Sequence, residues 1–393
     1  MPPVNAGSPG PRRRAPSLEI VVAYFGHRFA GPLLASHFRH GLARAGGGAV
    51  RLEPSPLRFA ARMVKRRLRR RPGGPVLSVM VHPALAVLWP LVPRAQRLYV
   101  IHDTTPHPGR RLDLRWRFVS WLDRSLAARS ATVVALSAWS ADDWRRDHAP
   151  EGQRVLVVPH PEMVGPAAGR PMRPPELVGL HEPYVLLFGR ADRYKGVREL
   201  WPHLDRWRAA TGHTVVVAGV GSAADVPPGA ADDAGVRIVD RYLSEAEIDW
   251  LARGDGVLLL PYTSATQSGV LERFAAGPTV ALGYAVGGLA EQLASLHPDL
   301  AVAPGRPVEL LRRLDLLMAD ASLRAELARA KAERTRALDH RFVDALAELL
   351  GTPRPDASAG GAAVIDLTTE PETGTVTIHQ RSEPGPDVDR APR

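Results

Sequence analysis

Short apolar runs alternate with longer amphipathic stretches along most of the chain. In the first half, strand-like runs at residues 18–24, 75–81, 97–102 and 132–136 are separated by helical patterns over 32–44, 112–128 and 138–146. Buried strands that alternate with helices are typical of a parallel sheet covered by helices on both faces. This half therefore predicts a doubly wound α/β domain.

The alternation stops and then restarts. Residues 161–175 hold five prolines and two glycines, which predicts an interdomain linker at about 166–180. After it, we expect strands at 184–188, 214–218, 237–239, 256–260 and 279–282, and helices at 196–210, 244–253, 269–276, 289–296 and over 307–350. Ser244 and Glu247 have the spacing of a capping box. The sequence thus predicts two Rossmann-like domains, 17–165 and 181–350, that face a central cleft where the strands end.

Both ends of the chain lack such patterns. Residues 1–16 and 351–393 are rich in Pro, Gly and polar residues, and we expect disorder in both. No apolar stretch of about 18 residues and no signal-like core are present, so we expect a cytoplasmic protein. The absence of cysteine excludes disulfides and thiolate metal sites.

Positive charge is concentrated in the first half of the chain. Residues 1–180 hold 28 Lys and Arg against 11 Asp and Glu, while residues 181–393 hold 23 against 30. The basic residues are densest in the stretch that begins at Arg58 and ends at Arg71. This indicates an anionic partner, either a membrane surface or a phosphate-bearing substrate, unless it reflects only an Arg-biased composition. No nucleic-acid-binding module is recognisable, so we expect no nucleic-acid partner.

Residues 56–68 within this basic region have the pattern of an amphipathic helix. Cations flank an apolar stripe made of Leu57, Ala60, Ala61, Val64 and Leu68. Such a helix can dock on anionic lipid at a membrane. It can equally cover a sheet and keep its charged side in water.

A first candidate binding loop follows the strand at 184–188. Gly189 lets backbone approach a ligand closely, and Arg190 and Lys195 could converge on a diphosphate. The alternative is that both cations are ordinary solvated surface residues.

A second candidate loop runs from Pro261 to the helix that is expected to begin near Ser268 and Gly269. The free N–H groups of a helix start can bind an anion. Glu272 lies on the same helix face as Gly269, where it could accept hydrogen bonds from a ribose or only complement the helix dipole.

Four segments in this order resemble the retaining GT-B glycosyltransferases of sequence family 4. In chain order these segments are 101–107, Gly189-Arg190…Lys195-Gly196, 265–270 and Val286-Gly287-Gly288-Leu289. The similarity extends over about residues 18–350. It implies metal-independent, retaining transfer of a hexosyl group from a nucleotide-diphosphate sugar, with no other cofactor.

The resemblance also implies roles for the donor-binding residues. Gly189, Arg190 and Lys195 would hold the pyrophosphate, and the motif residues Gln267, Ser268 and Gly269 would line the donor site. Glu272 matches the second Glu of the family's Glu-x7-Glu pattern, which binds the ribose. Ser264 stands where the family has the first Glu, which contacts the donor sugar, and a serine there is neutral.

In the first half, the resemblance implies that His102 and Asp103 are catalytic, with His102 pointing toward the donor sugar. The alternative for His102 is a core histidine, and His107 is a nearby competitor. Gly26 and Gly31 belong to a candidate loop at the cleft that a tight turn explains equally well.

Four further inferences concern the base, metals, the acceptor and the possible loss of catalysis. Tyr242 could border the nucleotide base, although packing is its more ordinary role. Asp387 and Asp389 fall in the tail, so we expect no metal site. The acceptor is expected to be a glycan or a lipid-linked molecule of polysaccharide or glycolipid biosynthesis, at the inner face of the membrane if the enzyme is peripheral. The substitution at Ser264 keeps open a non-catalytic binding or scaffold protein of the same fold.

Overall fold

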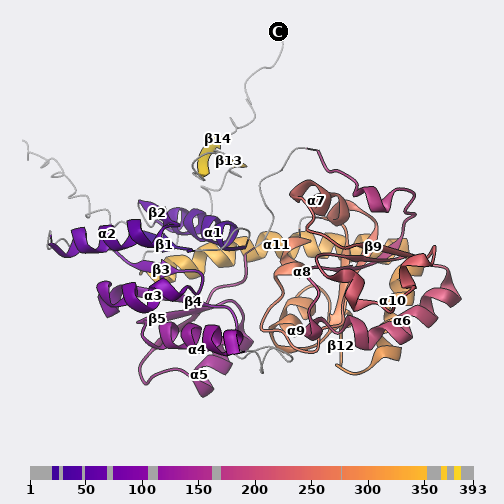
Figure 1. Ribbon diagram of the computed structural model, residues 1–393, viewed down its shortest axis with the longest axis horizontal. Helices are drawn as coiled ribbons and strands as arrows, with labels where there is room; N and C mark the ends of the chain where they lie inside the picture. Colours follow the sequence, from indigo (N-terminus) through magenta and orange to yellow (C-terminus); the bar gives the residue numbers. More distant parts are fainter. Residues whose placement is uncertain are drawn as a thin grey trace, which may run out of the picture.

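The computed structural model describes residues 20–25, 30–46, 49–68, 74–104, 114–161, 170–275, 277–351, 364–369 and 376–381. Two six-stranded sheets, each with helices packed against it, form the two halves of the molecule (Figure 1). Gly26, His107 and the N-terminal segment 1–16 lie outside the described residues.

The first sheet has the strand order β2-β1-β3-β4-β5-β6, and all of its strands are parallel. Its elements are β1 (Ile20–Ala23), α1 (Ala30–Arg44), β2 (Val50–Glu53), α2 (Pro56–Leu68), β3 (Val76–Ser78), α3 (Pro83–Leu88), β4 (Arg97–Ile101), α4 (Leu114–Ala128), β5 (Thr132–Ala135), α5 (Ala138–Asp147) and β6 (Arg154–Val157).

The second sheet has the order β12-β11-β10-β7-β8-β9 and is also parallel throughout. Its elements are β7 (Tyr184–Phe188), α6 (Val197–Thr211), β8 (Val215–Ala218), β9 (Val236–Val239), α7 (Glu245–Arg253), β10 (Gly256–Leu260), α8 (Gly269–Arg273), β11 (Val280–Tyr284), α9 (Gly287–Ala294), β12 (Ala301–Val302), α10 (Pro307–Ala319) and α11 (Ala321–Leu350).

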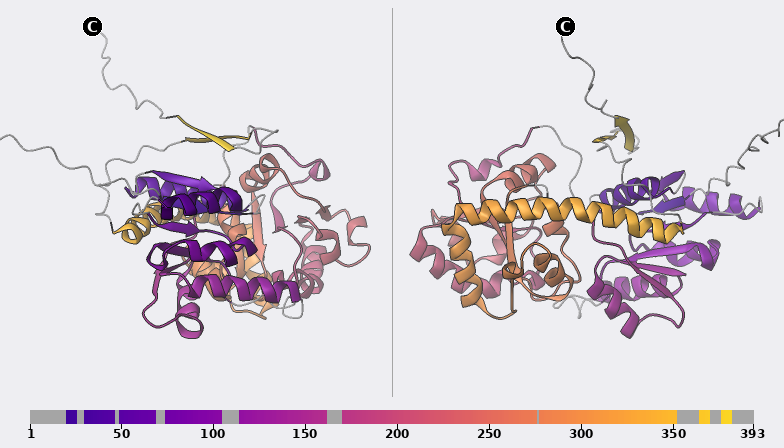
Figure 2. Two further views of the ribbon diagram at one scale, coloured as in Figure 1. Left: turned by 60° about the vertical axis from the view of Figure 1, so that its left-hand side comes forward. Right: turned by 180° about the vertical axis from the view of Figure 1, so that it is seen from behind.

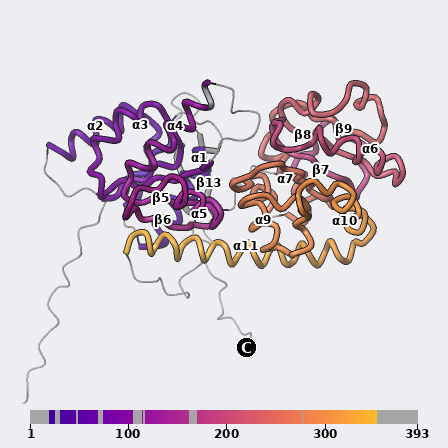
Figure 3. The backbone as a smooth tube through the Cα atoms, turned by 90° about the horizontal axis from the view of Figure 1, so that it is seen from below, coloured from indigo at the N-terminus to yellow at the C-terminus, as the bar shows by residue number. Residues whose placement is uncertain are grey.

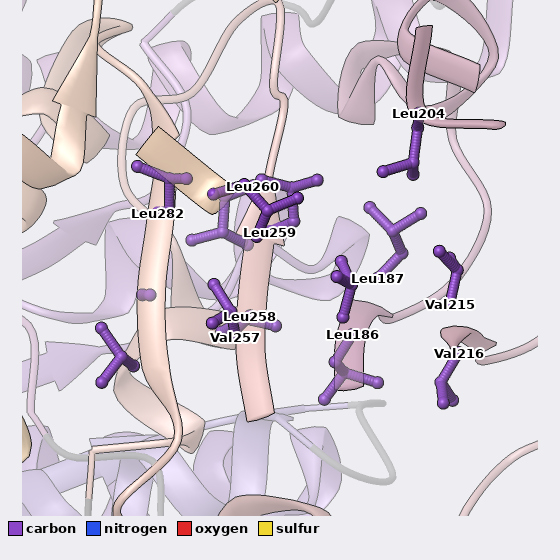
Figure 4. Close-up of a cluster of buried hydrophobic side chains, with 14 of the residues drawn as sticks. Leu186, Leu187, Leu204, Val215, Val216, Val257, Leu258, Leu259, Leu260 and Leu282 are labelled. Atoms are coloured by element: carbon purple, nitrogen blue, oxygen red, sulfur yellow. The ribbon is translucent and has the colours of Figure 1, made fainter. Parts of the chain in front are cut away.

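Continuous aliphatic sequences explain why these strands form the centre of each half. β7, β8 and β10 read YVLLF, VVVA and GVLLL, and helices cover both faces of a parallel sheet, so every other position does not need to be polar. Figure 4 shows Leu186, Val216 and Leu258 within the resulting core of the second sheet. The predicted α/β class with two doubly wound sheets is confirmed.

The last helix connects the two halves. α11 runs along both of them (Figure 2), and its C-terminal end packs on the first sheet, where Phe342 lies edge-on to Phe38 of α1 with ring centroids 5.3 Å apart. The sequence pattern assigns residues up to 350 to the second domain. The structure differs because the buried face of residues 342–349 completes the core of the first domain.

Several elements differ from the sequence-based prediction. The short strands β2, β6 and β12 and the one-and-a-half-turn helix α3 were not anticipated, because each is too short to show a period. In the tail, where we expected no regular structure, β13 (Val364–Thr369) and β14 (Val376–Arg381) form an antiparallel pair. Their β-branched residues were the available signal. Among the described helices, none is long and apolar enough to cross a membrane.

Candidate functional site

The order of the second sheet identifies where a ligand would bind. The chain starts at β7, moves outward through β8 and β9, and then returns to the other side of β7 with β10. Ligands of open α/β sheets bind at the carboxyl ends of the strands where the order reverses. The loops after β7 and β10 meet at this switch point, and they are the two loops that the sequence analysis selected.

Gly189 and Lys195 are packed against each other at the end of β7. Gly189 has a φ of +107°, and a Cβ atom there would overlap Nζ of Lys195. Lys195 ends the 3-10 turn Arg193–Lys195, and its Nζ donates to the Phe188 carbonyl at 3.0 Å and lies 5.8 Å from the centre of the Tyr262 ring. The ammonium group is therefore held at the carboxyl end of β7, which is the first strand of the second domain in chain order.

The charge of Lys195 is buried and differs from that of most buried cations in its surroundings. Its side chain is 7% exposed, and no described carboxylate forms an ion pair with it. Burial lowers the pKa of Lys195 to about 8, an effect that Asp192 and Asp225 oppose and Arg190 reinforces. Arg190 itself is exposed beside it. The pair thus provides positive charge at the switch point, with Lys195 buried and Arg190 at the surface.

The turn after β8 is a part of the site that the sequence analysis missed. Gly219 has a φ of +134°, and a Cβ atom there would overlap the Gly189 carbonyl. Gly221 has a φ of +83°, and its N–H donates to Asp240 at 2.5 Å. The two glycine turns after β7 and β8 pack directly against each other, which needs residues without side chains. The Gly-x-Gly spacing after a predicted strand was the signal that could have found them.

Hydrogen bonds hold the loop after β10 at both ends. Thr263 donates its N–H to the Tyr194 carbonyl at 2.7 Å. Ser268 caps α8 by accepting from Leu271 N–H at 3.1 Å, and its own N–H donates to Gln292 at 2.7 Å. Ser264 lies half-buried between these anchors, and Gly269 begins α8. Because α8 has only five residues and the Ser268 N–H is occupied, the expected anion site at this helix start is weaker than the sequence suggested.

Glu272 occupies a different environment from the one we expected. It is 1% exposed, and Arg334 of α11 donates to its carboxylate at 2.9 and 3.2 Å while Gln292 donates at 2.7 Å. The Arg334 side chain is 9% exposed. The carboxylate is thus paired with a distant helix, so complementing the α8 dipole is not its main interaction, and its contact with a ribose stays a prediction.

Contacts between the two halves gather around Thr266. Its hydroxyl donates to Asp103 at 2.7 Å, and its carbonyl accepts from the Ser137 hydroxyl at 3.0 Å. Close by, Glu291 of α9 accepts from the N–H groups of Ala138 and Trp139 at the start of α5. The loop after β10 therefore lies against the loop that follows β4.

His102 lies next to this contact. Its Nε2 donates to the Val79 carbonyl at 2.7 Å, so that nitrogen bears a proton, and the ring is half-buried. Two buried polar atoms near the same contact have no hydrogen-bond partner in the described part of the chain: Thr104 Oγ1 and Gln267 Oε1. Buried polar atoms normally have partners, so these two are candidates for contacts with ligand hydroxyl groups.

His160 is a second residue that the sequence analysis missed. It follows β6, it is buried, and its Nδ1 donates to the Pro161 carbonyl at 2.9 Å. A Cβ on Gly269 would lie 3.8 Å from its Nε2, which places the ring at the start of α8 in the other domain. Burial lowers the pKa of His160, against an opposing effect of Glu272, so the ring is neutral near pH 7.

The remaining candidates lie elsewhere. Gly31 belongs to the first turn of α1 and is not in a loop, so that prediction was wrong. Tyr242 is 66% exposed, which rules out packing as its main role. Among the residues with described positions, no cluster of His, Asp or Glu has the arrangement of a metal site. Gly287 and Gly288 allow α9 to start against the carbonyls of Ala265 and Thr266, since a Cβ on either glycine would overlap them.

Known proteins are similar to this chain in sequence and in fold. No family model matches the sequence. The 2-deoxystreptamine N-acetyl-D-glucosaminyltransferase of Streptomyces fradiae is 30% identical over 230 residues, which cover 54% of this chain and 53% of that protein. The chain therefore matches about half the length of this curated relative.

Solved structures show the fold. The sucrose-phosphate synthase of Thermosynechococcus elongatus matches 85% of this chain and 97% of its own, with a TM-score of 0.58 at 17% identity. An E. coli protein of trehalose-6-phosphate synthesis, solved with UDP-2-fluoro glucose, matches 84% and 97% with a TM-score of 0.56 at 14% identity. A glycosyltransferase from Rickettsia africae gives a TM-score of 0.59 at 12% identity, over 85% of this chain and 96% of its own. The chain has the GT-B fold.

Proposed function

We propose that this GT-B chain is a glycosyltransferase that uses a nucleotide-diphosphate sugar as donor. The observation behind the proposal is the ammonium group of Lys195, which is buried at the switch point of the second sheet and has no carboxylate partner in the part of the chain that the structure describes. A buried charge is expensive unless it is paired, so a site of this kind indicates an anionic ligand. The diphosphate of a nucleotide sugar supplies that charge, and the S. fradiae relative is named for a glycosyl transfer.

In the proposed reaction, the bond between sugar C1 and the diphosphate oxygen breaks, and a bond between C1 and an acceptor hydroxyl oxygen forms. The acceptor proton moves to the departing diphosphate on the same face of the sugar, so the anomeric configuration is retained. Lys195 and Arg190 stabilise the negative charge that develops on the leaving group, which is why we propose that the transfer needs no metal ion. The tight glycine turns at Gly189 and Gly219 let backbone approach the diphosphate.

The first domain is proposed to position the sugar and the acceptor. His102 and Asp103 follow β4, and the contact of Asp103 with Thr266 in the loop after β10 supports a role beside the transferred sugar. Gln267 Oε1 and Thr104 Oγ1 are suited to the sugar hydroxyl groups, since both are buried and lack a protein partner within the described residues. Ser264 replaces a carboxylate with a neutral hydroxyl, which favours a donor sugar that does not need an anionic contact.

The transferred group is proposed to be a hexosyl group, and the relative's name makes N-acetyl-D-glucosaminyl the first candidate. The acceptor is proposed to be a glycan or a lipid-linked molecule of polysaccharide or glycolipid synthesis. 2-Deoxystreptamine belongs in the acceptor panel because it appears in the same relative's name.

The test is a screen of nucleotide sugars by thermal stabilisation, followed by transfer assays with the best donor. A ligand at 100 times its dissociation constant adds about 2.7 kcal/mol of stability. Proton NMR of the product's anomeric position tests retention, and addition of EDTA tests metal independence. Stabilisation by a donor without any transfer or hydrolysis would favour the alternative, a non-catalytic binding protein of this fold. No stabilisation by any nucleotide sugar would overturn the proposal.

A further inference from the structure

The large apolar side chains that remain exposed are unevenly distributed. Seven of the twelve in the described part of the chain lie on three consecutive helices of the first domain: Leu57, Val64 and Leu68 on α2, Val87 on α3, and Leu114, Phe118 and Trp121 on α4. Scattered exposed hydrophobic residues are normal in proteins, but a concentration on one face marks an interaction surface.

α2 shows how this surface arises. The helix packs on its domain through Phe59 and Met63, which are buried, whereas Leu57 and Leu68 are 83% and 80% exposed. Positions 57, 61, 64 and 68 fall on one side of a helix with 3.6 residues per turn, opposite the buried side. The apolar stripe predicted from the sequence therefore faces solvent, and it does not cover the sheet.

α3 and α4 continue the same surface. α3 contacts both α2 and α4, and Figure 3 shows the three helices side by side. Val87 of α3 is 75% exposed, and Phe118 and Trp121 of α4 stack with ring centroids 5.9 Å apart. We refer to the exposed residues Leu57, Ala61, Val64, Leu68, Val87, Leu114, Phe118 and Trp121 together as the three-helix face.

Among the described residues of α2, α3 and α4, the exposed charges have a single sign. Arg58, Lys65 and Arg67 on α2 and Arg117 on α4 are exposed. α2 and α3 contain no acidic residue, and the one acidic residue of α4, Asp123, is buried and accepts a hydrogen bond from Tyr99 at 2.5 Å. Apolar side chains between exposed cations, without an exposed acid, complement a surface that is anionic outside and apolar beneath.

We propose that the three-helix face docks on an anionic lipid bilayer, with Phe118 and Trp121 at headgroup level and the leucines of α2 below it. Aromatic residues are enriched at that depth, and cations are attracted by anionic headgroups. The interface spans three helices, and it is wider than the basic segment at 58–71. The docking itself is argued independently of the proposed function. Only its purpose, which is to bring the active site to a lipid-linked acceptor, rests on that function.

The absence of cysteine from the sequence allows a direct test with single labels. Val64→Cys and Val87→Cys place an environment-sensitive fluorophore on the face, and Val308→Cys on α10, where the native residue is also 75% exposed, is the matched control. With phosphatidylcholine vesicles that contain phosphatidylserine, we expect a blue shift at positions 64 and 87 and none at 308. The shift should disappear in 1 M salt, where the Debye length is about 3 Å, and without phosphatidylserine.

Co-sedimentation with the same vesicles tests which groups bind. Leu57→Gln with Leu68→Gln should weaken binding at least tenfold, and Val178→Gln with Val308→Gln, a matched exposed pair in the second domain, should not. Arg58→Gln with Lys65→Gln should also weaken it more than tenfold, because each cation near the surface contributes roughly fivefold. Arg206→Gln with Arg336→Gln, which removes the same charge from exposed sites elsewhere, is the control.

Failure of this inference is distinguishable from failure of the proposed function. Absence of wild-type binding, an equal shift at position 308, or unchanged binding of the α2 variants would overturn the docking surface. A concentration-dependent dimer that hides position 64 without vesicles would assign the face to a second copy and overturn it as well. Vesicle binding is measured without donor, and transfer to a soluble acceptor is measured without vesicles, so each result stands by itself.

Discussion

Lys195 and Glu272 are two buried charged residues near the same edge of the second sheet, and their surroundings are opposite. The Lys195 ammonium contacts a backbone carbonyl and the face of Tyr262, without a carboxylate partner among the described residues. The Glu272 carboxylate is held by Arg334 and Gln292. The Lys195 ammonium has no counter-charge in contact within the described residues, and the Glu272 carboxylate is neutralised by Arg334.

This difference distinguishes a charge that is available to a ligand from a charge that stabilises the fold. Burial disfavours the charged form of a side chain, and an uncompensated buried charge persists where function requires it. A buried ion pair with good geometry is instead a structural connection, which becomes costly only when one partner is removed. The contacts of Glu272 tie the loop after β10 to α11, whereas the assignment of Lys195 to ligand binding is part of the proposed function.

The largest effect is expected for Glu272→Gln. It leaves the Arg334 guanidinium buried without its counter-charge, and breaking such a pair destabilises proteins by about 3–5 kcal/mol. Chemical denaturation should show this loss, and Arg334→Gln should show a similar one. The double variant should be less destabilised than the sum of the two, because the first change already removes the pair. A variant that unfolds like the wild type but has a raised donor KM would instead make Glu272 a ribose ligand.

The next effect concerns Lys195→Met, which removes the charge but keeps much of the apolar stem. Loss of a charge-assisted contact should weaken donor binding by about 1.5–3 kcal/mol, roughly 10- to 150-fold. The free energy of unfolding should not fall, since a buried charge without a carboxylate partner is removed. Titration calorimetry and denaturation measure the two quantities. Arg193→Ala, in the same turn but exposed, is the control. Donor affinity equal to that of the control would return Lys195 to an ordinary structural role.

Much of the second domain follows from local sequence. The apolar runs at 184–188 and 256–260 became β7 and β10 with the predicted bounds, and the capping box of Ser244 and Glu247 is present at the start of α7. These features depend on residues that are neighbours in the chain, so the pattern of hydrophobic positions contains them. The loop that contains Lys195 follows β7 as that pattern predicts, and its role in donor binding stays a prediction.

Long-range partners could not be predicted in this way. The residues that define Glu272 and Asp103 are Arg334, 62 residues away, and Thr266, 163 residues away. Periodicity shows that a helix has a buried face, but it does not show which domain that face meets. The same limit hid the packing of Phe342 on the first domain. The exposure of the α2 stripe could not be predicted either, because a membrane-docking helix and a sheet-covering helix have the same sequence pattern.

The third prediction is a pH dependence of donor binding. With a pKa of about 8, Lys195 is protonated at pH 7 and mostly neutral at pH 9 in the free protein. A bound diphosphate favours the ammonium form, so above pH 8 binding must take up a proton, and the donor Kd should rise about tenfold per pH unit. Below pH 7 the Kd should be constant. Calorimetry in buffers of different ionisation enthalpy measures the proton uptake, and Lys195→Met should show neither the slope nor the uptake.

The lowered pKa of Lys195 also affects the free energy of unfolding. As pH rises, the protein should become more stable while donor binding becomes weaker. The folded-state pKa of Lys195 lies below the ordinary lysine value, so the unfolded chain binds the proton more tightly. The contribution of this group to the free energy of unfolding should therefore increase as pH rises from about 8 toward 10.5. A donor Kd that does not change between pH 7 and pH 9 would contradict the assignment of Lys195 to the diphosphate.

The smallest effect is expected at Tyr262, whose ring lies beneath the Lys195 ammonium. An aromatic face attracts a cation by about 0.5–1 kcal/mol, or somewhat more when the pair is desolvated. Tyr262→Leu removes the ring and should lower the pKa of Lys195 further, so the pH at which donor binding begins to weaken should move below 8. Tyr262→Phe keeps the ring and should leave that pH where it is in the wild type. The two variants separate the ring from the hydroxyl, since only Tyr262→Leu removes the cation–π contact. A common shift in both would assign the effect to the hydroxyl, and the ammonium would then owe its position to the Phe188 carbonyl alone.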